Sequence, residues 1–337
     1  MNKKVKWGVL GVAGIAVRRV IPAMQQSEWC EVVAIASRDL QKAERAARQL
    51  GISKAYGSYE ELIADSEIEA IYNPLPNHLH APWTIKAAEA GKHVLCEKPI
   101  SLNVAEAREI LEARNRAGVK IEEAFMVRTH PQWVAARELV RAGRIERVRS
   151  IAGYFSYYND DVANIRNVVE YGGGGLMDIG CYLINTARFI FEGEPRRVAG
   201  LVERDAQSGV DILTSAILDF PSGQTIFTCS TRVAPHQRVQ IIGERGRIEI
   251  EVPFNAPSDR RSRIFVDDSM DLFGSVETIE FEPVNQYTIQ GDLFSKAVRE
   301  DTEVAVPLED SIKNMAVIEA VFRAARSGKW ETVASEA

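Results

Sequence analysis

The sequence predicts an α/β protein made of two domains, and three observations support this prediction. The chain has 337 residues, more than one hydrophobic core comfortably holds. Short apolar runs alternate with helical patterns up to residue 125, as in a doubly wound parallel sheet. From residue 147 onward, strand-like runs follow one another almost without helices, which indicates an antiparallel sheet. We therefore expect one domain at 1–125 and a second, α+β domain at 126–337.

The first domain should contain six strands joined by helices. Apolar runs predict strands at 5–10, 31–37, 54–56, 69–72, 93–96 and 119–122. Helical patterns follow a glycine-rich loop through residue 26 and recur at 39–50, 59–65, 82–90 and 104–117. Because a helix follows each strand, the strands should all run parallel, with right-handed connections between them.

The second domain should begin with a helix at 131–142 and continue as a sheet. A long alternating run at 147–158 leads to four consecutive glycines, Gly172 to Gly175, and to a helix at 176–191. Further strands are predicted at 197–203, 212–220, 224–230, 238–243, 247–252, 264–266 and 277–281, with a hairpin turn at 221–224. Helices at 286–299 and 308–327 close the chain.

Composition argues against several classes of partner. The formal net charge is −6 and no stretch concentrates lysine and arginine without interleaved acids, so we expect no nucleic-acid partner. No run is long and apolar enough to span a bilayer, so we expect no membrane partner. The lysines before residues 7–17 imitate an export signal, but cleavage there would remove the glycine-rich turn. We therefore expect a cytoplasmic protein.

The cysteines support a reducing compartment. They lie far apart in mostly apolar surroundings, with no CxxC pair and no Cys/His cluster: Cys30, Cys96, Cys181 and Cys229. This pattern predicts buried free thiols and indicates neither a disulfide framework nor a metal site.

The loop after the first predicted strand is a candidate dinucleotide site. It reads Gly11-Val12-Ala13-Gly14-Ile15-Ala16. Gly11 permits the tight turn, and the following helix N-terminus offers amide groups to a pyrophosphate. Alanine at the third fingerprint position, Ala16, is allowed, whereas Ala13 at the second is a departure for which Gly14 compensates. A purely structural turn is the alternative interpretation.

The residues after the second predicted strand favour NADP, with NAD possible. An acid in this position would hold the ribose 2′-hydroxyl, whereas a small polar residue with arginine accommodates a 2′-phosphate. The sequence here is Ser37-Arg38-Asp39, and Arg38 can pair with a phosphate or stack on adenine. Alternatively, Ser37 or Asp39 merely caps the next helix, which is compatible with either coenzyme.

The segment Cys96-Glu97-Lys98-Pro99 is a candidate reaction centre. Lys98 leaves a buried strand between a carboxylate and a proline that fixes φ, so it is held more rigidly than a surface lysine. Burial would lower the pKa of Lys98 and Glu97 would raise it, so that one charge state is selected for proton transfer. A surface turn is the alternative.

Four segments carry a resemblance to a known family: Gly11 to Ala16, Asn73 to His80, Gly91 to Pro99 and Gly173 to Tyr182. Together they resemble the glucose–fructose oxidoreductase, inositol dehydrogenase and rhizopine-catabolism family. The resemblance covers essentially the whole chain and is closest to the sugar and dihydrodiol dehydrogenases, because Tyr182 stands where inositol dehydrogenases carry histidine. It implies a Rossmann domain and a large open, mostly antiparallel sheet used for oligomerisation.

The resemblance also implies roles for individual residues. Leu75, Pro76, Asn77 and His80 look like the wall along the nicotinamide and its ribose, and Glu97 looks like a cofactor ribose contact. Lys98, Asp178 and Tyr182 look like the reaction centre.

The chemistry of that centre leaves the proton-transfer group open. The alcohol proton needs a base within hydrogen-bond reach, which is either Tyr182, activated by the Lys98 ammonium, or Lys98 itself. Asp178 would orient the sugar hydroxyls or Lys98, unless it merely caps a helix, and Tyr182 could instead be a packed core aromatic. The glycine run before Asp178 should let the backbone approach a ligand closely. Among polar residues near the cleft segments we select Arg166 for substrate binding; the other candidates are Arg128, Tyr154, Asn159, Asn185 and Tyr287.

We therefore predict an NADP-dependent oxidoreductase that acts on a secondary alcohol or carbonyl of a sugar or cyclic polyol. One alternative is a glycosidase that keeps its nicotinamide bound and uses transient oxidation. Another is a coenzyme-binding regulator without catalysis. A sheet with one open face further predicts a homodimer or homotetramer.

Overall fold

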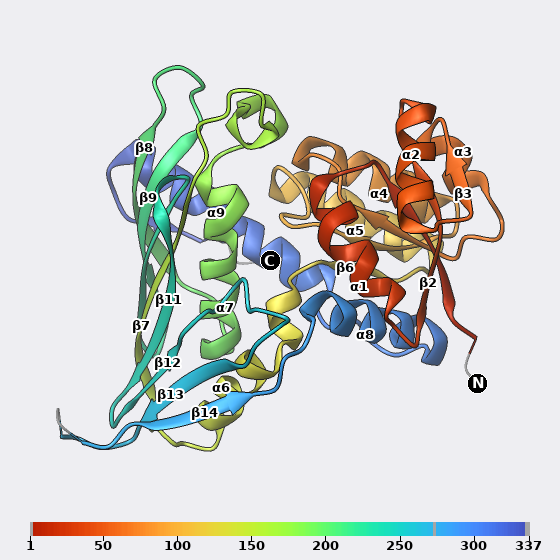
Figure 1. The fold of residues 1–337 in the computed structure, drawn as a ribbon. Coiled ribbons are helices and arrows are strands. Elements are labelled where there is room, and N and C mark those ends of the chain that lie inside the picture. The colour runs from red at the N-terminus through yellow and green to blue at the C-terminus, as the bar shows by residue number, and fades with distance from the viewer. Residues whose placement is uncertain (1–2, 272–273, 334–337) are drawn as a thin grey trace. The chain divides into compact units, whose positions relative to one another are not determined.

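The chain forms two compact units. The computed structural model describes residues 3–271 and 274–333 (Figure 1). One unit contains residues 1–126 together with 285–312, and the other contains 127–284 together with 313–337. The division differs from the predicted one in the segment 285–312, which was expected in the second domain.

The first unit is built on a six-stranded parallel sheet. The strands lie in the order β3-β2-β1-β4-β5-β6, and neighbours pair in parallel. The chain winds outward from β1 in one direction and then from β4 in the other, which confirms the doubly wound prediction. The strands are β1 (Val5–Leu10), β2 (Cys30–Ala36), β3 (Lys54–Tyr56), β4 (Ala70–Asn73), β5 (His93–Cys96) and β6 (Ile121–Glu123).

Both faces of this sheet are buried. In β1 the side chains of Val5, Trp7 and Val9 pack into one apolar cluster, while Leu10 joins the other. This alternation follows the two-residue period of a strand. The covering helices are η1 (Ala16–Val20), α1 (Ile21–Gln25), α2 (Leu40–Leu50), α3 (Tyr59–Ala64), η2 (Asn77–Leu79), α4 (His80–Glu89), α5 (Val104–Ala117) and α8 (Gln286–Glu300).

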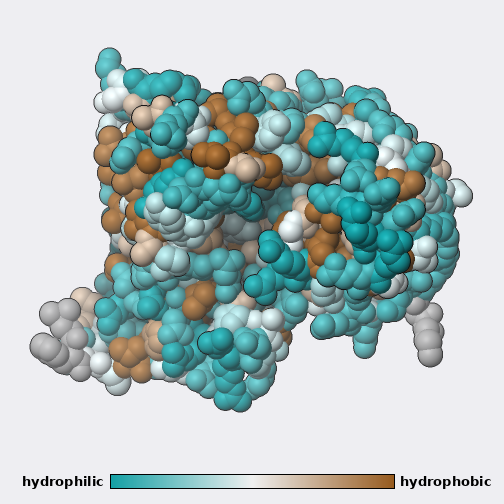
Figure 2. Space-filling view, turned by 45° about the horizontal axis from the view of Figure 1, so that its top comes forward, coloured by the Kyte–Doolittle hydropathy of each residue, from teal (hydrophilic) through white to brown (hydrophobic). Residues whose placement is uncertain are grey.

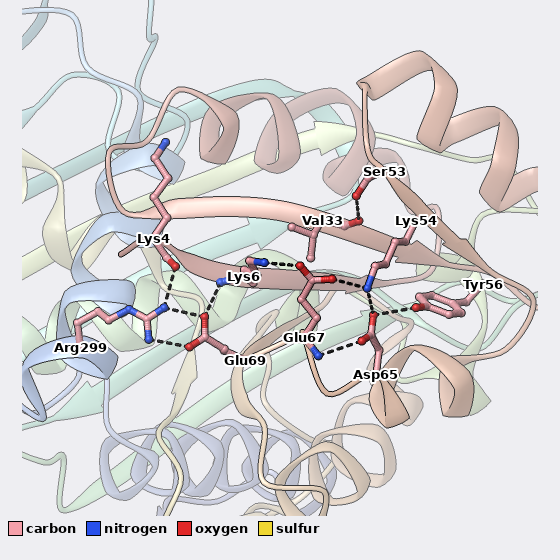
Figure 3. Close-up of polar contacts among 10 residues, drawn as sticks. All are labelled: Lys4, Lys6, Val33, Ser53, Lys54, Tyr56, Asp65, Glu67, Glu69 and Arg299. Carbon is pink, nitrogen blue, oxygen red and sulfur yellow. Dashed lines mark hydrogen bonds and ion pairs between the residues drawn. The ribbon is translucent and has the colours of Figure 1, made fainter. Parts of the chain in front are cut away.

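Helix α8 belongs to the first unit because it is bonded to β1 and to the turn before β4. Phe294 packs against Trp7 with ring centroids 5.2 Å apart, and Trp7 Nε1 donates to Ser295 Oγ at 3.2 Å. Arg299 grips both carboxylate oxygens of Glu69 at 2.7 and 2.6 Å (Figure 3). Such bidentate pairs fix geometry as well as charge. Periodicity predicted this helix but could not show where it packs.

A second group of charges closes the amino-terminal edge of the same sheet (Figure 3). Lys54 Nζ lies 2.6 Å from both Asp65 and Glu67, and Tyr56 donates to Asp65 at 2.8 Å. The hydrogen bond from Lys54 lowers the pKa of Asp65 to about 2. Polar bonding thus fixes the amino ends of these strands, and the candidate site residues of this unit follow the carboxyl ends.

The second unit is built on a nine-stranded sheet in the order β14-β13-β12-β11-β7-β10-β9-β8-β15. In the described part of the chain the pair β7–β10 is parallel, whereas the other pairs are antiparallel. The mostly antiparallel prediction is confirmed. The strands are β7 (Val148–Tyr158), β8 (Arg197–Arg204), β9 (Asp211–Asp219), β10 (Gln224–Ser230), β11 (Arg232–Gly243), β12 (Arg247–Ile250), β13 (Ser262–Asp267), β14 (Glu277–Phe281) and β15 (Glu331–Thr332).

Helix α7 lies against one face of this sheet (Figure 1). Gly153 of β7 makes room for it, since a Cβ there would lie 2.4 Å from Leu183 Cδ2. The helices of this unit are η3 (Met126–Thr129), α6 (Pro131–Arg141), η4 (Ile165–Asn167), η5 (Val169–Tyr171), η6 (Leu176–Gly180) and α7 (Cys181–Phe191); α9 (Leu308–Ser327) spans both units. Among residues 3–271 and 274–333, no helix is long and apolar enough to cross a bilayer.

Four predicted elements differ from the observed ones in where or how they begin. The helix expected at 82–90 begins at His80, directly after a 3₁₀ turn, and β11 begins at Arg232 rather than at residue 238. The helices predicted after Gly11 and over 176–191 each start with a π-helical turn, η1 and η6. Sequence periodicity does not distinguish a π turn from an α turn over five residues.

Candidate functional site

The glycine turn after β1 leaves no room for a side chain at residue 11. Gly11 has φ +84° and donates to the Ala36 carbonyl at 2.9 Å. A Cβ on Gly11 would lie 2.9 Å from Leu75 Cδ2, so the loop after β1 presses against the loop after β4. In a doubly wound sheet, this switch point is where a pyrophosphate binds. Beyond it Gly14 is exposed, Ala13 and Ile15 are half-buried, and Ala16 is buried.

Arg38 lines a hollow of about 410 Å³ beside this loop. It hydrogen-bonds with Tyr59, whose hydroxyl would lie 3.6 Å from a Cβ on Gly11. Burial raises the pKa of Tyr59, against the opposing effect of Arg38. The hollow is otherwise lined by Gly57, Ser58, Glu60, Leu79 and Trp83.

The two neighbours of Arg38 have structural contacts, and one of them, Asp39, caps the next helix. Asp39 is the N-cap of α2 and accepts from the Lys42 amide at 3.2 Å. Ser37 is buried and accepts from the Asp39 amide, also at 3.2 Å. Both side chains therefore shape the turn that presents Arg38, and Arg38 is the one of the three that lines the hollow.

The turn that carries Lys98 is fixed on both sides. The Glu97 amide donates to the Asn73 carbonyl at 3.0 Å, and Tyr72 Oη donates to Glu97 Oε1 at 2.6 Å. The Lys98–Pro99 peptide is cis. After it, the Ile100 amide donates to Glu123 Oε1 at 2.8 Å. Lys98 therefore leaves a backbone that β4 and β6 hold in place.

His80 lies inside the first unit rather than along a coenzyme surface. Its side chain is buried, with Nδ1 2.7 Å from the Pro99 carbonyl oxygen and Nε2 2.6 Å from the Leu75 carbonyl oxygen. The predicted direct contact with the cofactor is therefore wrong for His80, because both ring nitrogens face backbone oxygens. The ring instead ties the Leu75 loop to the Lys98–Pro99 turn. Leu75 is buried, and Pro76 and Asn77 next to it are half-buried.

In the second unit, Asp178 is held by two donors. Tyr157 Oη donates to Oδ2 at 2.5 Å, and Arg166 Nε lies 2.9 Å from Oδ1. Asp178 belongs to η6, whose N-cap is Gly175, so it is not the helix cap that the alternative interpretation required. The structure thus brings together Asp178 and Arg166, two of the predicted residues.

The glycine run before Asp178 packs against the protein itself. Gly174 has φ +115°, and a Cβ there would lie 1.9 Å from Asp211 Oδ1. A Cβ on Gly173 would lie 2.5 Å from the Arg166 carbonyl oxygen. Gly173 and Gly174 therefore have a packing reason, and the close approach of the run to a ligand stays a prediction. Asp211 itself is buried, and its Oδ2 accepts from the Leu176 amide at 2.6 Å.

Tyr182 lies in an aromatic cluster on α7. Its ring centroid is 6.0 Å from Phe155 and 5.6 Å from Phe254, and only 5% of the residue is exposed.

The remaining polar candidates are scattered. Tyr154 lines the opposite face of the large sheet, Asn185 is buried, Asn159 is half-buried, Arg128 lies over the Phe189 ring, and Tyr287 is in the first unit, where burial raises its pKa to about 12.

Sequence reasoning missed Tyr59, Tyr157 and Asp211. Tyr157 is one of several tyrosines in the run 154–158, and nothing local separates it from the others. Asp211 opens an apolar strand, and this acid before a hydrophobic run was the available signal. Within the described residues, no group of three or more His, Cys, Asp or Glu could hold a metal ion.

The first unit has the features of a nucleotide-binding Rossmann domain: a parallel sheet, a glycine turn at its switch point and an arginine-lined hollow beside it. The comparisons assign the chain to a family. Residues 5–125 match the model "Oxidoreductase family, NAD-binding Rossmann fold", and residues 133–249 match the "GFO/IDH/MocA C-terminal domain". The chain therefore belongs to the GFO/IDH/MocA family of oxidoreductases, which confirms the resemblance.

Similar proteins cover nearly the whole chain. An uncharacterized oxidoreductase of Rhizobium meliloti is 46% identical over 98% of this chain and 99% of its own length. D-xylose 1-dehydrogenase (NADP(+)) 2 of Haloferax volcanii is 39% identical over 96% of this chain and 98% of its own. The crystal structure of aldose-aldose oxidoreductase from Caulobacter crescentus, complexed with glycerol, has a TM-score of 0.90 and 28% identity, covering 98% of this chain and 100% of that one.

We predict that Gly174→Ala destabilises the protein severely. The strained φ and the collision with Asp211 should together lower the free energy of unfolding by about 2–6 kcal/mol, measured by urea denaturation. Gly143→Ala is the matched control, because Gly143 has φ +74° but a Cβ added there would meet nothing within 4 Å. It should cost only about 1–2 kcal/mol. Equal losses in the two variants would contradict the packing role of Gly174.

Proposed function

We propose that this protein is an NADP-dependent oxidoreductase that interconverts a secondary alcohol and the corresponding carbonyl of a sugar or a related cyclic polyol. The observation that carries the proposal is the carboxyl edge of the parallel sheet, where the glycine turn, Arg38 and Lys98 follow β1, β2 and β5. Two of the similar proteins are named for sugar substrates, and one of these also for NADP. A noncatalytic coenzyme-binding protein would need no Lys98 held as firmly as this one is.

Coenzyme choice follows from the turn after β2. Ser37 and Asp39 hold the turn, and Arg38 brings a guanidinium to the adenosine end of the proposed site. A 2′-phosphate pairs well with this planar cation, whereas a free ribose 2′-hydroxyl gains less. An acid that would repel the phosphate is used as a helix cap instead. These features support NADP over NAD.

The chain must supply proton transfer and orientation. The bound nicotinamide supplies the hydride acceptor or donor. We assign proton transfer at the substrate oxygen to Tyr182, and Lys98 is the second residue of the proposed reaction centre. Asp178, fixed by Tyr157 and Arg166, orients a substrate hydroxyl. Its two bound donors leave it suited to hydrogen-bond acceptance rather than to exchange of a proton.

The outer face of the large sheet supports self-association. It carries a hollow of about 670 Å³ lined mainly by apolar or small residues, on the side away from α7. Leu201 is 75% exposed and Ile226 48% exposed on this face. Hydrophobic residues are exposed on the left side of Figure 2, the side on which Figure 1 draws this sheet. We propose that a second copy of the chain covers this face in a homodimer or homotetramer.

The buried free cysteines favour a cytoplasmic setting.

Arg38→Ala should weaken NADP binding about 10- to 100-fold and NAD binding less than threefold, because charge-assisted bonds to the 2′-phosphate are lost. Dissociation constants from fluorescence titration of both coenzymes test this. Arg48→Ala, which removes an exposed arginine from the same unit, should change neither value. Equal losses of both coenzymes in Arg38→Ala would contradict the assignment of NADP.

Lys98→Met and Tyr182→Phe should each lower kcat by about 100-fold or more, the usual range for loss of acid–base catalysis. The measurement is nicotinamide absorbance with a panel of aldoses, keto sugars and polyols, using both coenzymes. Lys120→Met, which removes a lysine paired with Asp301, is the control and should keep wild-type rates. Glycoside cleavage without net coenzyme turnover would instead identify the glycosidase alternative.

Leu201→Glu should shift the protein toward monomer, because a charge would be buried in the apolar face of the proposed interface. Sedimentation velocity at several concentrations measures this. Val162→Glu places the same charge at an 80% exposed residue outside the strands and should leave the assembly unchanged. A Leu201→Glu protein that sediments like wild type would argue against this interface.

A further inference from the structure

Tyr157 stands on the helix-covered side of the large sheet. In β7 the odd-numbered residues face this side: Gly153 meets Leu183 of α7, Phe155 meets Tyr182, and Tyr157 meets Asp178. Tyr158, one residue further, is 60% exposed. The two-residue period of the strand therefore selects Tyr157, and not its neighbour, to contact Asp178.

The Tyr157 phenol can act only as a donor to Asp178. Burial, and then the Asp178 carboxylate, raises the pKa of Tyr157 well above its ordinary value, while Arg166 and Arg232 act in the opposite direction. The phenol therefore keeps its proton, and its hydrogen bond stabilises the ionised form of Asp178. The other charged or titratable groups near this pair are Asp211, Cys181 and Cys229.

The second donor approaches from another segment. Arg166 belongs to η4, which follows β7, and contacts Oδ1, whereas Tyr157 contacts Oδ2. Donors on opposite oxygens fix the rotation of the carboxylate as well as its charge. A carboxylate has about four acceptor positions, so the contacts with Tyr157 and Arg166 do not by themselves prevent Asp178 from accepting from a sugar hydroxyl.

We propose that Tyr157 is a positioning residue of the reaction centre: with Arg166 it keeps Asp178 ionised and in one orientation, so that Asp178 binds a substrate hydroxyl and does not carry the reaction's proton. This inference rests on the proposed function, which places Asp178 in the reaction centre. It extends that function to a tyrosine and explains why the centre needs a separate proton-transfer group.

The test compares Tyr157→Phe with Tyr158→Phe. Tyr157→Phe should lower kcat/KM about 10- to 100-fold, since a hydrogen bond to a charged group is lost. The acidic limb of its pH–rate profile should move to higher pH, because the ionised form of Asp178 loses a donor. NADP affinity should not change. Tyr158→Phe removes only a 3.3 Å contact with exposed Asp160 and should match wild type in all three measurements.

Two further variants separate this inference from the proposed function. In an Asp178→Asn background, Tyr157→Phe should cause less than a threefold additional loss, as expected for residues that act through one another. If Asp178→Asn alone keeps wild-type kcat/KM, the proposed function fails at its reaction centre. If Asp178→Asn is impaired but Tyr157→Phe behaves like Tyr158→Phe, only the present inference is overturned.

Arg166→Lys tests the second contact with Asp178. The Arg166 side chain is half-exposed, so its substitution should affect folding least. It keeps the positive charge but removes the planar donor. The acidic limb should again move to higher pH, by less than in Tyr157→Phe. An unchanged pH–rate profile in Arg166→Lys would contradict the proposal that Tyr157 and Arg166 together hold Asp178. This outcome would count even if Tyr157→Phe could not be purified as a folded protein.

Discussion

Close approach of backbone to neighbouring side chains, at positions where only glycine fits, is the constraint on which both units depend. In the first unit, Gly11 brings the loop after β1 against Leu75 of the loop after β4. In the second, Gly174 brings the start of η6 against Asp211. Each contact sets the place at which a helix leaves the sheet. The candidate site residues are carried on these helices and on the loops beside them.

In the first unit, the polar interactions differ between the two ends of the strands. At the amino ends of the strands, Lys54, Asp65 and Glu69 belong to charge networks that tie β1, β3, β4 and α8 together. At the carboxyl ends, hydrogen bonds such as Tyr72 to Glu97 hold single loops in position. Anchoring the sheet at one end leaves the loops at the other end to carry chemistry, as is usual for this fold.

The fold could be predicted from periodicity, because alternating strands and helices allow few topologies. Candidate site residues could be selected where the residue type suits one main role at its position. Arg38 and Lys98 were selected in this way, and their roles stay predictions. His80 was misplaced because a histidine in a loop motif gives no sign of burial, which depends on Pro99, 19 residues away. The packing role of the glycine run depended on Asp211, more than thirty residues further on, and so did not follow from the run itself. Packing of α8 on β1 joins residues nearly 290 apart, as Trp7 and Ser295 show.

Two carboxylates, Asp211 and Asp178, fix the start of η6 in the second unit in different ways. Asp211 is buried, and its Oδ2 accepts hydrogen bonds from the Leu176 amide at 2.6 Å and from Thr214 Oγ1 at 3.1 Å. It therefore fixes the backbone at the start of η6. Asp178, two residues after Leu176, keeps 12% of its side chain exposed and is set by Tyr157 and Arg166. The first carboxylate determines where the turn begins, and the second is then oriented by donors from outside the turn. Because backbone and side chain are fixed by separate groups, Asp178 can be preorganised for a ligand before any ligand binds, which is where such a residue contributes most to binding and catalysis.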